Sequence, residues 1–301
     1  MTETTGLATG RITGGTALVT DRVPSGGASA VLRSVVARPT LTIAFLWLVL
    51  VVLSAVAPTV LTAHDPLAAD PAAKLTAPDA AHWFGTDQLG RDLYARVVHG
   101  TALTLQAAVL AIVIGLVGGS TIGLVAGFVG GVVDAALMRV ADVLLAIPSL
   151  LLSLTIVTVL GFGTTNVAVA VGVASIATIA RIMRAEVVRV RTAPYVEAAS
   201  AGGNRWWRVL LVHVLPNASG PVLVLTALEF GTAILAVSSL SFLGYGAQPP
   251  QPEWGSLVAT GRDFIASSWW LTTIPGLVIA VTVLAGNRVA RALDTERRAT
   301  R

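Results

Sequence analysis

The stretch EAASAGGNRWWRVLLVHVLPN, from Glu197 to Asn217, separates two long apolar segments of the chain. It carries an acid, two arginines, two adjacent tryptophans and a Gly-Gly pair. Lipid offers no hydrogen-bond partners to polar groups, so such a stretch belongs at the surface of a bilayer rather than inside it. The stretch therefore predicts a membrane protein with a structured segment at the membrane surface.

The composition agrees with a chain that crosses a membrane several times. Of its 301 residues, 54% are hydrophobic and 12% are charged, whereas about 25% of the residues in a soluble domain are charged. The chain has no cysteine, which excludes disulfides and cysteine-based metal or redox sites. Its single lysine, Lys74, follows no glycine-rich turn, so the chain lacks an ATP-binding loop of the Walker type.

Six apolar segments are each about long enough to cross a hydrocarbon core of about 30 Å with about 20 residues. They cover residues 41–61, 103–128, 137–160, 166–188, 221–243 and 269–289. The predicted fold class is therefore an all-α membrane protein with six transmembrane helices. Residues 1–40 are expected to be a disordered tail with a short surface helix near 30–37. Residues 41–102 would hold the first span and a loop, residues 103–289 a five-helix core, and residues 290–301 a second tail.

The positions of the basic residues predict the orientation. If the N-terminus is inside, sixteen of the 20 basic residues lie on the inner side. The other four are Lys74, Arg91, Arg96 and Arg262. An excess of arginine marks cytoplasmic segments. Both termini and the stretch from Glu197 are thus expected to be cytoplasmic, and the loops 62–102 and 244–268 to face outward.

The first half of the segment 192–217 reads as a short helix followed by a turn. Pro194 suits the first turn of a helix, and Glu197 lies near the positive helix end. Gly202 and Gly203 then supply a C-cap and a sharp turn.

The second half of this segment reads as another helix. Asn204 is expected to cap it, and Pro216 to end it. One explanation for the pair is an amphipathic element that rests on lipid headgroups. The other is a surface built to contact a second protein.

The spacing of this segment resembles the EAA loop of bacterial binding-protein-dependent ABC importer permeases. Glu197-Ala198-Ala199 is followed after three residues by Gly203 and after nine more by His213-Val214-Leu215-Pro216. Three other segments are similar to the C-type subunit of the dipeptide/oligopeptide (nickel) branch: HWFGTDQLGRDLYARVVHG (82–100), RVADVLLAIPSLLL (139–152) and LSFLGYGAQPPQPEWG (240–255). The resemblance covers roughly residues 40–285.

The resemblance implies a type I ABC importer permease in the bacterial inner (cell) membrane. Such a subunit is not an enzyme and has no catalytic residues or cofactor of its own. It provides half of a pathway for dipeptides or oligopeptides and works with a second homologous permease, two ATPase subunits or domains that bind ATP and Mg²⁺, and an extracytoplasmic peptide-binding protein, without nucleic acid. The expected ATPase-coupling residues are Glu197, Ala198, Ala199, Gly203, His213, Leu215 and Pro216.

Three alternatives remain open at this level. The same machinery could import nickel or another small solute. An ATP-independent secondary transporter would usually show an inverted repeat and buried ionisable groups, and no clear repeat is seen. An intramembrane enzyme would need a nucleophile or metal ligands within the bilayer, and no such group is apparent.

Four charged residues are candidates for the pathway or for a gate. Asp87, Arg91 and Asp92 are expected to pair with one another in the outer loop, either as a lid over the bundle or as a contact for the binding protein. No metal site is expected there, because His82 and His99 are not at ligand spacing. Glu229 falls near mid-membrane, either as a pathway residue or as a structural acid that is protonated or hydrogen-bonded to a neighbouring helix.

Three further patterns carry expectations about packing. Gly115, Gly119, Gly123, Gly127 and Gly131 recur every fourth residue and predict a groove filled by another helix of this chain or of a partner.

The two remaining patterns lie near the ends of spans. Arg139 and Asp142 are expected to form an intrahelical or intersubunit ion pair, and Pro148 to kink its helix. In the outer loop, Glu253 and Trp254 follow a stiff proline-rich stretch and are expected to present a charge and an aromatic ring. This stretch would be a lid or a docking point for a delivery protein, or a plain loop.

Overall fold

The structure, a computed structural model, describes residues 39–299 and the side chains of residues 39–292. The predicted surface helix near 30–37 lies outside the described residues, as does nearly all of the predicted tail 1–40.

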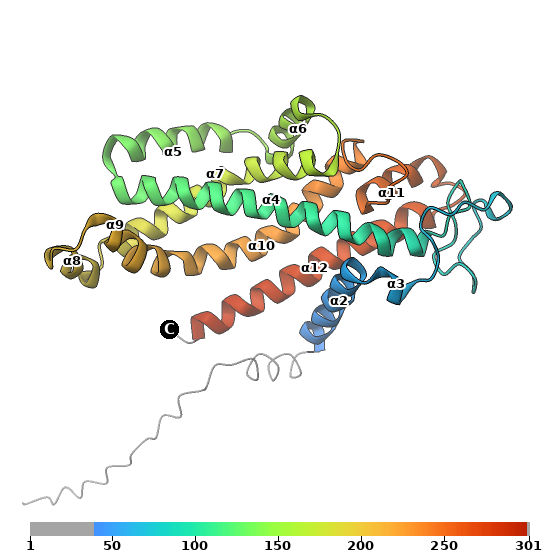
Figure 1. Cartoon of the computed structure of the whole chain (residues 1–301), viewed down its shortest axis with the longest axis horizontal. Coiled ribbons are helices and arrows are strands. Elements are labelled where there is room, and N and C mark those ends of the chain that lie inside the picture. Colours follow the sequence, from blue (N-terminus) through green and yellow to red (C-terminus); the bar gives the residue numbers. More distant parts are fainter. Residues whose placement is uncertain (1–38, 300–301) are drawn as a thin grey trace, which may run out of the picture.

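Long helices run side by side along the molecule (Figure 1). They are α2 (Pro39–Val56), α4 (Leu93–Val129), α7 (Thr164–Arg191), α10 (Leu215–Phe242) and α12 (Trp270–Ala299). Shorter helices connect them: α3 (Pro58–Leu61), η1 (Pro71–Ala73), α5 (Gly131–Leu145), α6 (Ser149–Leu160), α8 (Pro194–Ala201), α9 (Trp206–Arg208), η2 (Val209–Val214), α11 (Trp254–Gly261) and η3 (Arg262–Phe264). We call the end of the bundle that carries α8 and α9 the α8 end, and the opposite end the α11 end.

The predicted all-α, six-span class is confirmed. By length and composition, five helices can cross a membrane, and the bent pair α5 and α6 makes up to six. Within residues 39–299 no β-strand is present, and pairing is limited to the single bridge Thr86–Asp92.

The second span is longer than the predicted 103–128. α4 begins at Leu93, because Asp92 caps it by accepting a 2.7 Å hydrogen bond from the backbone N–H of Ala95. A hydropathy criterion misses this start of the helix because Arg91, Asp92 and Arg96 are charged. They are nevertheless buried against the loop that precedes them.

The third span is broken rather than kinked. α5 and α6 meet at an angle of 92° around residues 146–148. Pro148 has no N–H for a helix ladder and disfavours a helical residue before it, so the helix stops instead of bending. The prediction of one helix over 137–160 that is only kinked at Pro148 was therefore wrong.

The fifth span also departs from its prediction, because Pro216 does not end a helix. Residues Trp206–Phe242 run continuously through α9, η2 and α10. η2 is a π-helical turn, in which the N–H of Leu215 bonds to the carbonyl of Leu210 five residues back. The wider turn places Pro216 in the first turn of α10, where its missing N–H costs little.

The glycine groove is filled by α7 of the same chain. A Cβ on Gly123 would lie 2.4 Å from the carbonyl oxygen of Ala180, and one on Gly119 would lie 2.6 Å from the Cβ of Ile179. The intrachain alternative is thus confirmed for Gly115 to Gly127. Gly131 is the exception, since its φ is +57° and no atom lies near its missing side chain.

Candidate coupling and outer-loop sites

Helix α8 forms where the sequence places it. Pro194 occupies the first turn, Glu197 is the acid near the N-terminus, and Gly202 is the C-cap. Gly203 follows with a φ of +79°, a conformation that L side chains rarely adopt. The predicted first helix and its glycine turn are confirmed.

Asn204 does not cap the next helix, as we had expected. Its side-chain Nδ2 instead donates a 2.9 Å hydrogen bond back to the carbonyl of Ala199. Arg205 is the N-cap of α9 and gives no side-chain cap. Asn204 therefore closes the C-terminus of α8 and stiffens the turn around Gly203.

An apolar cluster anchors the turn between α8 and η2. Val196 of α8 and Val209 and Val214 of η2 are each at most 3% exposed. They pack with Met183, Val187 and Val190 of α7 and with Ala218 and Val222 of α10. α8 is therefore packed firmly against α7 and α10, because protein interiors are close-packed.

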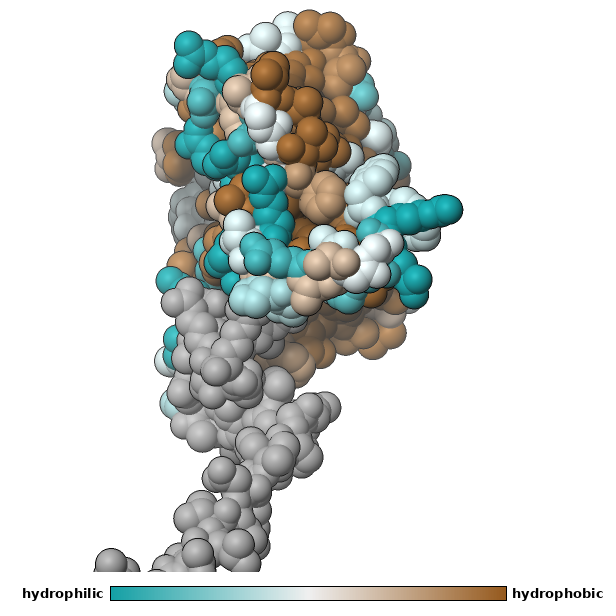
Figure 2. All heavy atoms as spheres, turned by 90° about the vertical axis from the view of Figure 1, so that its left-hand side faces the viewer, coloured by the Kyte–Doolittle hydropathy of each residue, from teal (hydrophilic) through white to brown (hydrophobic). Residues whose placement is uncertain are grey.

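The opposite face of this segment is open to solvent. Glu197, Ala198, Gly203 and Pro216 are exposed, whereas Ala199, His213 and Leu215 are partly buried. Trp206 is 67% exposed. Seen from the α8 end, hydrophilic side chains gather over part of the surface beside hydrophobic surface (Figure 2).

A cavity of about 350 Å³ lies beneath this surface, between α8 and α9. Its lining includes Glu197, Ser200, Asn204, Arg191 and Trp206. The seven predicted coupling residues thus belong to one continuous segment at one end of the bundle. The hollow beside them is lined by charged, polar and aromatic side chains, which suits contact with another protein.

Charged side chains brace the helices that carry this segment. The guanidinium of Arg184 on α7 binds Asp134 of α5 through two hydrogen bonds of 2.9 and 2.6 Å. Arg191 donates to the carbonyls of Gly127 and Phe128 at the C-terminus of α4.

The expected pair of Arg139 and Asp142 does not form. Asp142 binds Arg181 of α7 instead, and Arg139 is exposed. The partner of Asp142 is thus on another helix of the same chain, so the intrahelical alternative was wrong, and the intersubunit alternative stays a prediction.

At the α11 end, Asp87 and Arg91 form the expected ion pair. The Nε of Arg91 lies 2.7 Å from Oδ2 of Asp87, and the Nε of Arg96 lies 3.6 Å from the same oxygen. All three residues are less than 9% exposed. Arg96 also donates to the carbonyl of Pro66, so the cluster clasps the loop to the start of α4.

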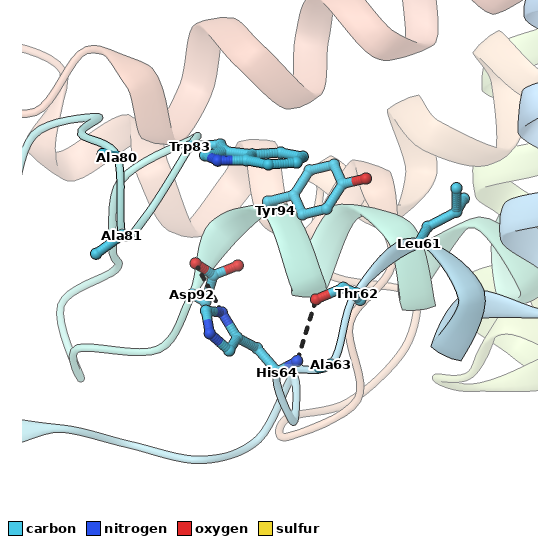
Figure 3. A pocket seen from close by; sticks show the side chains of 9 residues that line it. All are labelled: Leu61, Thr62, Ala63, His64, Ala80, Ala81, Trp83, Asp92 and Tyr94. Carbon is cyan, nitrogen blue, oxygen red and sulfur yellow. Dashed lines mark hydrogen bonds and ion pairs between the residues drawn. The ribbon is translucent and has the colours of Figure 1, made fainter.

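Asp92 is not part of that pair, contrary to the prediction. One carboxylate oxygen caps α4, and the other, Oδ2, lies 2.8 Å from Nδ1 of His82. Nδ1 of His64 lies 3.5 Å from the same Oδ2 (Figure 3). The spacing of His82 and His99 in the sequence did not reveal this group. His99 bonds to the carbonyl of Ala95, and the second histidine beside Asp92 is His64, which is distant in the sequence.

Glu253 and Trp254 do not present a charge and an aromatic ring at the surface, so that expectation was wrong. Glu253 is fully buried, and Trp254 is 1% exposed. The indole Nε1 of Trp254 donates a 3.0 Å hydrogen bond to the carbonyl of Val97 on α4. Burial raises the pKa of the Glu253 carboxyl above its usual value, and hydrogen bonds from Ser241, Ala247 and Thr164 partly oppose that shift.

Glu229 is half-buried on α10. In the part of the chain that the structure describes, its carboxylate has no hydrogen-bond or ion-pair partner. No hydrogen bond to a neighbouring helix supports the structural alternative, so both readings of this residue continue as proposals.

Comparison with known proteins identifies relatives of this chain. A family model described as "Binding-protein-dependent transport system inner membrane component" matches residues 119–299. The chain is 37% identical to the dipeptide transport system permease protein DppC of Alkalihalophilus pseudofirmus, over 80% of each chain. It is 38% identical to the probable D,D-dipeptide transport system permease protein DdpC of Escherichia coli K12, over 75% of this chain and 76% of that one.

Another relative is named for a different peptide. The chain is 41% identical to the glutathione transport system permease protein GsiD of Escherichia coli O6:K15:H31, over 70% of this chain and 69% of that one.

Solved structures support the fold. The chain is similar to an amino acid ABC transporter crystallised with histidines, with a TM-score of 0.52 and 18% identity over 67% of this chain and 94% of that one. It is also similar to the inward-facing MetNI methionine ABC transporter, with a TM-score of 0.51 and 17% identity over 65% of this chain and 95% of that one. At this identity the likeness concerns the fold alone.

Proposed function

Because the chain belongs to the family of binding-protein-dependent transport system inner membrane components, we propose that it forms half of the translocation pathway of an ATP-driven importer of short peptides. A second, homologous permease would supply the other half. ATP and Mg²⁺ would be bound by two ATPase subunits or domains. The chain itself would carry no catalytic residues.

Peptide is the favoured cargo because of the names of the relatives. They are called dipeptide, D,D-dipeptide and glutathione permeases, and all of these cargoes are short peptides. A soluble binding protein on the outer side would select the peptide. Nickel or another small solute is the alternative cargo.

The observation that carries the proposal is the build of the α8 segment. Its exposed face holds Glu197 and the turn at Gly203, and its buried face holds Val196 and Val209 within the cluster that continues into α7 and α10. A force applied to the exposed face is therefore passed to two long helices. We assign this face to contact with the ATPase.

The orientation follows from the same assignment. The α8 end would be cytoplasmic and the α11 end would face outward. The exposed Arg205 and Arg208 at the α8 end agree with a cytoplasmic position. The C-terminal part of α12 points toward the same end (Figure 1), and Arg288 bonds to Thr40 near the start of α2, so both described ends of the chain would lie on the cytoplasmic side.

Site-directed cross-linking tests the coupling assignment directly. The chain has no cysteine, so a single Ser200→Cys variant carries one reactive thiol at the α8 surface. We expect this thiol to cross-link to the ATPase in the assembled complex. The matched variant Ser267→Cys, at the exposed part of the α11 end, should not. Cross-linking of both positions, or of Ser267→Cys alone, contradicts the assignment.

Reconstitution tests whether the chain works as a subunit. Liposomes that contain the whole complex, with the binding protein, should take up a dipeptide only when ATP is present on the ATPase side. Omission of the second permease or of the ATPase should abolish uptake. ATP-independent peptide uptake by this chain alone would overturn the proposal. ATP-dependent uptake of nickel but not of peptide would show that the cargo is nickel instead of peptide.

A further inference from the structure

Three potential metal ligands meet at the α11 end from three separate segments. His64 follows α3, His82 lies in the loop after η1, and Asp92 is the N-cap of α4. One donor atom from each lies within 4.8 Å of the other two. Oδ2 of Asp92 lies between the two imidazoles, 2.8 Å from Nδ1 of His82 and 3.5 Å from Nδ1 of His64.

We propose that His64, His82 and Asp92 bind one divalent transition-metal ion of the zinc class. Two imidazole nitrogens and one carboxylate oxygen form a donor set that suits Zn²⁺ and its first-row neighbours, whereas Mg²⁺ and Ca²⁺ prefer oxygen donors only. Three protein ligands leave the fourth tetrahedral position for water or another ligand.

The distances from the two imidazole nitrogens to Oδ2 of Asp92 are close to what such an ion requires. At metal–donor distances of about 2.0–2.1 Å, two donors on a tetrahedral ion lie about 3.3 Å apart. The distance between His64 and Asp92 already matches, and that between His82 and Asp92 needs to open by about half an ångström. The side chain of His64 is 55% exposed and is free to complete the set.

The surroundings hold these ligands in place. The other oxygen of Asp92 accepts from the N–H of Ala95, which fixes the orientation of its carboxylate. The N–H of His64 donates to the hydroxyl of the buried Thr62. Two of the ligands, His64 and Asp92, border a cavity of about 270 Å³ that is lined also by Trp83 and Tyr94 (Figure 3), which gives an ion access and room for a fourth ligand.

A hydrogen-bonded pair of His82 and Asp92 without metal is the competing explanation. It accounts for the 2.8 Å contact but gives no role to His64, whose ring centroid lies 5.9 Å from that of His82. An ion would instead tie the end of α3, the middle of the loop and the start of α4 together. It would thereby close a loop whose ordering is otherwise opposed by chain entropy.

Zinc titration of the full-length chain, purified with the subunits that accompany it and stripped with a chelator, tests the site. Calorimetry should detect one Zn²⁺ per chain that is absent or bound at least about tenfold more weakly in His64→Ala and in His82→Ala. His99→Ala is the matched control, since this nearby histidine points to Ala95, and it should bind like the wild type. Co²⁺ in place of Zn²⁺ should give the absorption of a tetrahedral site in the wild type and in His99→Ala, but not in His64→Ala or His82→Ala.

Asp92 requires a milder variant because it also caps α4. Asp92→Asn keeps a side-chain oxygen for the N–H of Ala95 and removes the charge, so it should weaken Zn²⁺ binding while the thermal unfolding of the metal-free protein stays close to that of the wild type. Zn²⁺ binding that is unchanged in His64→Ala overturns the three-ligand site. Equal competition by Ca²⁺ overturns the assignment to the zinc class. Neither result depends on which solute the transporter carries.

Discussion

The hydroxyl of Ser241 donates a 2.6 Å hydrogen bond to Oε1 of Glu253, and both residues are at most 1% exposed. The N–H of Ala247 donates to Oε2 of the same carboxylate at 2.8 Å. The described residues place no cation in salt-bridge contact with it. This acid therefore holds together the end of α10, the loop after it and the start of α11 without charge neutralisation.

The buried Glu253 predicts a specific pH dependence of stability. Burial raises the pKa of its carboxyl in the folded protein, whereas the unfolded value is about 4.3. Between these two pKa values the folded state binds more protons than the unfolded state. The stability that the proton on Glu253 contributes is therefore complete below the unfolded pKa and is lost as pH rises through the folded pKa. Thermal unfolding in detergent at a series of pH values measures this loss.

Glu253→Gln is the variant that isolates this effect. The amide can accept from Ala247 and donate to Ser241, and it does not titrate. The difference in melting temperature between wild type and variant should therefore shift in favour of Glu253→Gln as pH rises. A difference that stays constant with pH would contradict the assignment of the proton to Glu253.

The close approach of α4 and α7 predicts that the glycine groove tolerates no side chain. Gly123→Ala would place a Cβ 2.4 Å from the carbonyl oxygen of Ala180, and overpacking of this kind costs about 1–3 kcal/mol. Gly286→Ala is the control, because nothing lies within 4 Å of its added Cβ. Melting temperatures should fall for Gly123→Ala and be unchanged or raised for Gly286→Ala. Similar values for the two variants would argue against tight packing of α4 on α7.

The clasp around Asp87 predicts a large effect at the α11 end. Asp87→Ala leaves the buried Arg91 and Arg96 without their carboxylate, and an uncompensated buried charge costs about 3–5 kcal/mol. Asp263→Ala removes the partner of Arg262 in an exposed pair, and such pairs contribute about 0–1 kcal/mol. Limited proteolysis should cut the loop 62–92 much faster in Asp87→Ala than in Asp263→Ala. Equal rates would mean that the clasp does not hold the loop.

The φ of +79° at Gly203 predicts which substitutions uncouple the α8 segment. Gly203→Val places a β-branched residue where left-handed backbone costs about 1–2 kcal/mol, so the turn should shift and displace α8 from η2. Gly203→Asn is the control, since asparagine adopts this conformation more readily. Peptide-stimulated ATP hydrolysis should fall in Gly203→Val and be largely kept in Gly203→Asn, with equal amounts of chain in the membrane. Wild-type coupling in Gly203→Val would exclude this turn as the coupling element.

The sequence predicted those parts of the fold that depend on local signals. The six apolar segments and the helix–glycine turn from Pro194 to Gly203 follow from hydropathy, proline and glycine alone. The end of α5, the course through Pro216 and the start of α4 did not follow, because each depends on neighbours. Pro216 continues a helix only because a π-turn precedes it. α4 can start before the charged Arg96 only because loop residues bury that side chain.

The site residues also divide into those that local sequence signals predict and those that only the fold brings together. The α8 residues are contiguous in the chain, so their spacing was visible in the sequence. The group formed by His64, His82 and Asp92 was not visible, because the fold of the loop joins residues that no periodicity relates. Glu253 and Trp254 were expected at the surface since they follow prolines and are polar or interfacial by type. Only the partners Ser241 and Val97 reveal why they are buried.

Glu229 on α10 provides the last prediction. An ionised side chain within a bilayer costs about 2.5–3.5 kcal/mol, so such a residue faces protein or water rather than lipid. Its carboxylate is half-buried and has no partner among the described residues, which leaves it available to the positive amino group of a passing peptide. Glu229→Gln keeps the shape and removes the charge. Transport of dipeptides with a free amino terminus should therefore decrease more than transport of N-acetylated dipeptides.

Uptake into proteoliposomes with equal amounts of wild-type and variant complex measures this difference. Leu228→Met, a volume-conserving change at the neighbouring position, is the control for disturbance of α10 and should affect both peptides little. A pathway role requires that the ratio of free to blocked peptide uptake falls in Glu229→Gln alone. If both peptides lose the same fraction of uptake, the charge does not meet the amino group, and Glu229 acts through the packing of α10 instead.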